Sequence, residues 1–144
     1  MIIARNRLHI PEVVAKIGSL LPRKSKSYNR MKGDGMATSL DDLVNMTGVI
    51  LAFEFTPDGT CTSYKNVTRG MAAMICRFCA AVTMNFNALA SGFTELSEQQ
   101  WVPQKGWIYV GGSHTVILGR GGYRGVFAES SRVSIDEVSA ALAD

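Results

Sequence analysis

The amino-acid sequence predicts an α+β domain: a five-stranded antiparallel sheet with helices on its faces, in the order α-β-β-α-β-β-β-α. Three observations predict it. A β-branched and aromatic run, Val49 to Phe55, leads through a Pro- and Asp-Gly-containing turn into a second strand, which is typical of a hairpin. A long helical pattern then begins at Thr68. Finally, three short apolar runs separated by Gly-rich turns indicate a three-stranded meander.

Short helices are expected at both ends of this domain. Ser39 is suited to cap the first one, and Asp41 and Asp42 lie in its first turn, where the helix dipole favours carboxylates. Ser134 and Glu137 have the spacing of a capping box and predict the start of the last helix. The domain therefore opens and closes on a helix.

The long helix is expected to run for about 23 residues, from a Thr68 cap to Gly92, a residue suited to end a helix. We expect a polar connection from Thr94 to Gln100. Apolar residues occupy more of the circumference of this helix than contact with one sheet face would bury. A helix that is apolar on more than one side is buried on more than one side, so we expect a second subunit to cover it.

Charge divides the chain into two parts. Residues 1–35 carry eight basic and two acidic residues, a balance of +6, whereas residues 36–144 carry seven basic and ten acidic residues, a balance of −3. The basic character thus belongs to an N-terminal extension, and the domain at 36–144 is not expected to bind nucleic acid. Met36 is also a candidate start of the functional chain.

The extension at 1–35 is predicted to hold a short amphipathic helix with apolar residues at helical spacing between Ile10 and Leu21, followed by a polar linker. Such a basic helix can lie on an anionic membrane surface or dock into a partner's groove. Chain ends are often poorly ordered, which favours a disordered tail over membrane contact.

Cysteine content and hydropathy bear on the compartment. The three cysteines are an odd number and no signal peptide precedes them, so we expect a reducing compartment, the cytoplasm. No uninterrupted apolar run approaches the roughly 20 residues that span a bilayer. A transmembrane protein is therefore not expected.

The stretch LDDLVNMTGVILAFEFTPDGT, with the helix and meander after it, resembles the roadblock family of dynein-light-chain-like domains. A closer resemblance is to small uncharacterised bacterial proteins of this layout, which share a W-x-P-x-x-G-W segment like that from Trp101 to Trp107. The resemblance covers about residues 36–144 and implies a roadblock/profilin-like fold.

Roadblock-like domains generally lack catalytic residues and form homo- or heterodimers by pairing long helices and sheet edges. They act as scaffolds or as regulators of small GTPases. Here the resemblance implies a dimer face at Ala72, Cys76, Ala80 and Val82.

One cysteine pair has the spacing of redox and metal sites. Cys76 and Cys79 form a C-x-x-C motif, and on a helix both sulfurs share a face. The motif lies about two turns into the helix, where help from the dipole has faded. Cys61, His9 and His114 are not at ligand spacing, so no metal site is predicted. Buried packing is the commoner fate of such cysteines, and a thiol function with Cys61 as a third sulfur is the alternative.

Two further segments are candidates for ligand binding. The glycine-rich run from Gly119 to Gly125 is flanked by strands and lacks the features of a phosphate-binding loop. We expect a hairpin turn there, with anion contact by Arg120 and Arg124 as the alternative.

His114 is expected in an exposed turn. Trp101, Trp107 and Tyr109 are candidates for a pocket, although core or interface packing is commoner for such residues.

Three functional hypotheses follow. The first is a non-enzymatic homodimeric module that scaffolds or regulates a larger complex or a small GTPase, with no cofactor. The second is a thiol-dependent redox or sulfur-handling protein using Cys76 and Cys79. The third is a small-molecule sensor with a pocket between the sheet and the long helix.

Overall fold

The computed structural model describes residues 38–143. The predictions for the extension at 1–35 and for a start at Met36 lie outside these residues. Within them the predicted order of elements is confirmed, because the chain forms helix, two strands, long helix, three strands and helix.

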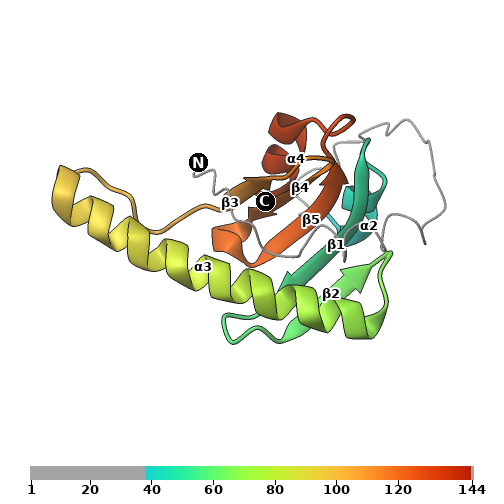
Figure 1. The fold of residues 1–144 in the computed structure, drawn as a ribbon, viewed down its shortest axis with the longest axis horizontal. Coiled ribbons are helices and arrows are strands. Elements are labelled where there is room, and N and C mark those ends of the chain that lie inside the picture. Colours follow the sequence, from blue (N-terminus) through green and yellow to red (C-terminus); the bar gives the residue numbers. More distant parts are fainter. Residues whose placement is uncertain (1–37, 144) are drawn as a thin grey trace.

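A single antiparallel sheet forms the middle of the domain (Figure 1). Its strands, in the order β2-β1-β5-β4-β3, are β2 (Cys61–Lys65), β1 (Val49–Phe55), β5 (Arg124–Glu129), β4 (His114–Gly119) and β3 (Trp107–Val110). The hairpin β1–β2 and the meander β3–β4–β5 are joined by pairing of β1 with β5. The predicted five-stranded sheet is thereby confirmed.

Helices cover both faces of the sheet, and each face has its own hydrophobic core. The long helix α3 (Arg69–Ser97) packs on one face, over Leu51, Phe53 and Phe127. The short helices α2 (Leu40–Val44) and α4 (Ile135–Leu142) cover the other face. Successive strand residues point to opposite faces, which is why alternate positions of β1 and β5 enter different cores.

The three helices begin at the capping residues that the sequence indicates. The Ser39 hydroxyl accepts a hydrogen bond from the backbone N–H of Asp42, and the Asp42 carboxylate accepts one from the Ser39 N–H. Thr68 accepts from Met71 at the start of α3. Ser134 accepts from the Glu137 N–H at the start of α4. Each hydroxyl satisfies an N–H that the first helical turn leaves without a partner.

The predicted end of α3 is wrong. The helix has 29 residues and continues through Gly92 to Ser97, so it is about 43 Å long at 1.5 Å per residue. Residues 94–97 of the expected polar connection are helical, and the Thr94 and Ser97 hydroxyls donate to backbone carbonyls one turn back. The left-handed residue that ends the helix is Glu98, with φ of 56°. No residue of α3 beyond Ala90 is buried, and Figure 1 shows this end running past the sheet.

The middle of α3 is attached to the sheet by a buried hydroxyl. Thr83 has no exposed surface, and its Oγ1 donates to the Gly122 carbonyl at 2.6 Å and accepts from Trp107 Nε1 at 2.9 Å. Gly122 lies in the 3₁₀ turn η1 (Arg120–Gly122), with φ of +96°, and a Cβ on it would lie 2.7 Å from the Thr83 methyl. Only glycine therefore fits against Thr83 at this point.

Replacing Thr83 by Val should lower the free energy of unfolding. The change keeps the shape of the side chain but leaves the Gly122 carbonyl and the Trp107 N–H buried without this partner, a loss of about 2–3 kcal/mol. Urea unfolding followed by circular dichroism measures it. The control Thr62→Val, at an exposed position of β2, should cost about 0.5 kcal/mol or less. Equal losses in both variants would contradict the anchoring role of Thr83.

Candidate functional site

The side of α3 that faces away from the sheet is unusually apolar. Among the described residues, five of the large apolar side chains that remain exposed lie on this helix, with Leu96 at 83% and Phe78 at 59% exposure; the other three are Met74, Met84 and Leu89. Single exposed apolar residues are ordinary, but a row of them on one helix indicates a surface that is covered by something else.

Four of these residues, all except Met84, belong to one line along the helix, which we call the outer stripe. Its positions are spaced by three or four residues, so they fall on the same side of the cylinder. The outer stripe consists of Met74, Phe78, Ala81, Asn85, Leu89, Gly92 and Leu96. The buried residues of α3, which include Ile75, Cys79 and Thr83, lie on the opposite side.

The dimer face implied by the resemblance is therefore misplaced. Ala72, Cys76 and Ala80 are buried against the sheet of their own chain, and Val82 is half-buried beside the same core. Small residues at these positions let the helix approach the sheet closely. The sequence pattern showed two apolar sides but did not show which of them faces the sheet, and the outer stripe is the free one.

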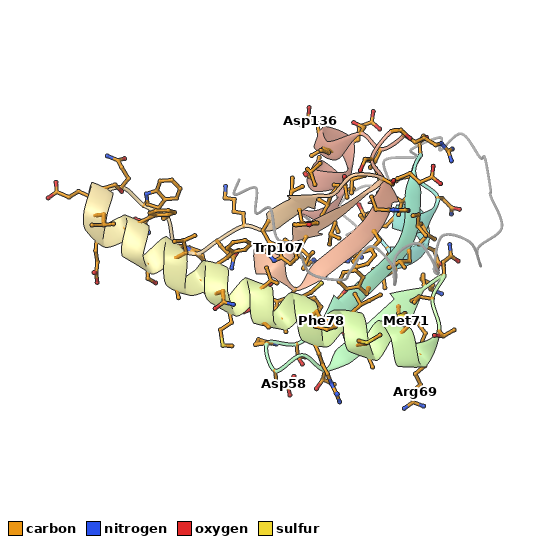
Figure 2. The ribbon with its side chains drawn as sticks, viewed as in Figure 1. Asp58, Arg69, Met71, Phe78, Trp107 and Asp136 are labelled. Carbon is orange, nitrogen blue, oxygen red and sulfur yellow. The ribbon has the colours of Figure 1, made fainter. Side chains whose placement is uncertain are left out.

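An aromatic cluster holds the chain where it leaves α3. The Trp101 ring lies on the Phe93 ring with 5.0 Å between centroids, and Trp101 Nε1 donates to Ser97 Oγ at 2.9 Å. Trp107 is buried instead between the sheet and α3 (Figure 2). Its ring is edge-on to that of Phe86, and Tyr109 packs against the same core. Trp101, Trp107 and Tyr109 thus do not line one pocket.

The space between the sheet and α3 is filled by core side chains, so the predicted sensor pocket does not appear there. Two open hollows lie on the surface beside the first turns of α3. One, of about 550 Å³, is lined by Gly70, Ala73, Met74, Arg77 and Phe78. The other, of about 330 Å³, lies between these turns and the β1–β2 turn. The larger hollow is mainly apolar and adjoins the outer stripe.

The cysteines are packed and not poised for thiol chemistry. Cys76 has no exposed surface and Cys79 only 5%, and burial raises the pKa of both thiols far above the ordinary range. Contact with Cys61 raises the pKa of Cys76 further. A reactive cysteine needs the opposite environment, exposed and electropositive. Within residues 38–143 no group of three metal-ligating side chains is assembled.

The glycine-rich segment forms η1 and the start of β5, between two paired strands, as the hairpin prediction requires. Its arginines lie beside a carboxylate: Arg124 Nε is 3.3 Å and Arg120 Nη1 is 3.8 Å from Glu54 Oε2. Arg124 is almost fully buried and also donates to the Thr38 carbonyl. His114 is the half-buried first residue of β4, not an exposed turn residue.

Helix α3 is long and apolar enough, by length and composition, to be a candidate membrane span. The sequence contains no uninterrupted run of that length because Arg77, Asn85 and Asn87 divide it. Core helices of water-soluble domains have the same composition, and one side of α3 is packed on its own sheet. The apolar excess of α3 therefore belongs to two surfaces, the core side and the outer stripe.

The native protein should have one readily reactive thiol. Attack on a disulfide reagent requires the thiolate, and burial holds Cys76 and Cys79 in the neutral form, whereas Cys61 is half-exposed. Titration with a chromogenic disulfide at pH 8 should show one fast thiol in the native state and three after unfolding in guanidinium. The variant Cys61→Ser should lose the fast phase. Rapid reaction of Cys76 and Cys79 in the native protein would favour the redox hypothesis.

The fold is that of a known structural class. The structure is similar to the crystal structure of a Roadblock/LC7 domain from Streptomyces avermitilis, with a TM-score of 0.62 and 12% sequence identity, over 72% of this chain and 85% of that one. At this identity the likeness shows the fold alone, and the predicted roadblock-like fold is confirmed. No curated protein matches the chain. The family model described as "Uncharacterized conserved protein (DUF2173)" matches residues 39–144, and the chain belongs to that family.

Proposed function

We propose that the domain is a non-enzymatic interaction module that forms a homodimer through the outer stripe of α3. The observation that carries the proposal is the exposure of Phe78 and Leu96 on a helix whose other side is already buried. The dimer would then serve as a scaffold or regulator within a larger complex, the small-GTPase-associated type being one form of it.

Burial of the outer stripe supplies a driving force for association. Fully burying one large apolar side chain contributes roughly 1.5–3 kcal/mol, and two copies would each bury several. The stripe from Met74 to Leu96 covers about 33 Å of helix, enough for an extended contact. A flat row of this kind fits another helix better than it fits a small molecule, which needs a concave site.

The chemistry of the described residues supports a binding role. The C-x-x-C thiols are buried, and the arginines of the glycine-rich turn lie beside Glu54. The likeness to a Roadblock/LC7 domain supports a module of the interaction class, because the resemblance implies dimerisation through the long helix. The three free cysteines fit a reducing, cytoplasmic compartment.

Replacing Phe78 by Glu should convert the dimer to a monomer without unfolding it. The side chain is exposed in the single chain, so the change costs the fold little, but in a dimer it places two carboxylates in an apolar contact. Light scattering coupled to size exclusion at micromolar concentration should give the mass of two chains for the wild type and of one chain for the variant.

The matched control is Ala140→Glu, which adds the same charge at an exposed position of α4, on the far face of the sheet. It should remain dimeric. A wild type that is monomeric under these conditions would overturn the proposal. Dimers that persist in Phe78→Glu but not in Ala140→Glu would move the contact to the other face.

A further inference from the structure

We propose that Cys61 and Cys76 form a reversible disulfide within one chain when the protein meets a hydroperoxide. Cys61 is the thiol that the oxidant reaches, and Cys76 is the buried thiol that then bonds to it. The inference does not depend on the proposed dimer. It also differs from the C-x-x-C hypothesis, because Cys79 takes no part in the bond.

The two cysteines come from segments that lie against each other. Cys61 is the first residue of β2, and Cys76 lies on the side of α3 that faces the sheet. The first half of α3 lies across β1 and β2 (Figure 1). A Cβ on Gly59 would lie 3.4 Å from the Arg77 Cα and 3.5 Å from the Ala80 Cβ. The turn just before Cys61 and the helix just after Cys76 are thus in van der Waals contact.

The thiols themselves meet in this contact. The Cys76 thiol is in hydrogen-bonding contact with that of Cys61, whose Sγ donates to the Ser63 carbonyl at 3.6 Å. Cys61 also packs against the core cluster that contains Cys76. Side chains as short as cysteine touch only when their backbones are close, and a disulfide requires Cα atoms within about 7 Å. The pair therefore has the proximity that the bond needs.

An oxidant can reach the Cys61 thiol. Cys61 is half-exposed and lines the hollow of about 330 Å³ between the first turns of α3 and the β1–β2 turn. Hydrogen peroxide is little larger than water, which occupies about 30 Å³ in the liquid, so the hollow admits it. Arg69 and Arg77 line the hollow too, against Asp58, whose carboxylate accepts from the Thr60 N–H at 3.0 Å. Reactive cysteines lie in partly exposed, electropositive surroundings of this kind.

Cys79 is not equivalent to Cys76. Burial alone raises the pKa of the Cys79 thiol, whereas contact with Cys61 contributes to the raised pKa of Cys76. Cys76 and Cys79 are one helical turn apart, but both are buried, so neither is exposed to an oxidant first. The thiol that Cys61 touches is that of Cys76.

The reaction has two balanced steps. First, the Cys61 Sγ attacks one oxygen of hydrogen peroxide; the O–O bond breaks, Cys61 becomes a sulfenic acid, and water leaves with the thiol proton. Then the Cys76 Sγ attacks the Cys61 sulfur; the S–S bond forms, the S–O bond breaks, and a second water leaves with the proton of Cys76. The two thiols lose two electrons, which reduce the peroxide to two waters.

Burial of Cys76 makes the second step slow but does not prevent it. The neutral thiol is a weaker nucleophile than a thiolate, yet Cys76 is held beside the sulfur that it attacks, and the departing hydroxyl takes its proton. Small thiols reverse the bond by exchange. Transient disulfides of this type act as redox signals in reducing compartments. The bond would join the edge strand β2 to α3 through a closed loop of residues 61–76.

Peptide mapping reads the pairing directly, because trypsin separates the three cysteines. Cleavage after lysine and arginine places Cys61 in peptide 33–65, Cys76 in 70–77 and Cys79 in 78–105. The full chain is treated with hydrogen peroxide, blocked with N-ethylmaleimide and digested without reduction. Mass spectrometry should find 33–65 linked to 70–77, and dithiothreitol should release the two. Linkage of 33–65 to 78–105, or to a second copy of itself, would overturn the assignment.

Variants test the two roles. Cys61→Ser and Cys76→Ala should each abolish the linked peptide. Cys79→Ala is the matched control, since it truncates another buried cysteine of the same helix, and it should keep the link. In Cys76→Ala the Cys61 sulfenic acid has no thiol to consume it, so dimedone should label Cys61 about fivefold more than in the wild type. Equal labelling of the two proteins would overturn the role of Cys76.

Unfolding provides a control that needs no variant. Oxidation of the wild type in guanidinium should give a mixture of the three possible pairs, because the fold no longer holds Cys76 against Cys61. The native protein should give the one pair. The same distribution of linked peptides in both states would contradict the proposal, since the fold would then not select the pair.

Discussion

The attachment of α3 to the sheet is the constraint on which the rest of this molecule depends. Thr83 bonds the turn η1 and Trp107 at once, so one hydroxyl fixes the rotation of the helix about its own axis. Gln104 adds to it by donating to the Thr83 carbonyl at 2.9 Å and to Asn87 at 2.7 Å. Rotation of a helix decides which side chains it turns towards solvent. The exposure of the outer stripe is therefore a consequence of this polar anchor together with the apolar packing of the inner side.

The two sides of α3 have different chemistry although both are apolar. The inner side is rich in alanine, cysteine and threonine, whose small volumes permit close packing on aromatic residues of the sheet such as Phe53 and Phe127. The outer side has methionine, leucine and phenylalanine separated by small residues. Flexible and bulky groups suit a contact that forms and adjusts after the domain has folded.

Local signals in the sequence predicted most of the fold. The caps at Ser39, Thr68 and Ser134 and the Asp58-Gly59 turn act over a few residues, so reading them needs no tertiary information. The end of α3 and the orientation of its faces depend on contacts with distant segments. The local sequence does not predict that the helix continues through Gly92 or that Ala72 faces the sheet. The roles of Thr83 and Gln104 were missed for the same reason, since their partners are 17 to 39 residues away.

The bond between Arg124 and the Thr38 carbonyl has a consequence for the assembled molecule. Arg124 shares its face of β5 with Val126, which packs in the core under α2 and α4, so Thr38 is fixed on the side of the sheet remote from α3. Two domains joined through α3 would therefore direct the entry points of their upstream chains outwards, to opposite ends of the assembly. Whatever the basic segments before Thr38 bind would be engaged at two separate sites, and bivalent attachment of that kind raises avidity without any new contact.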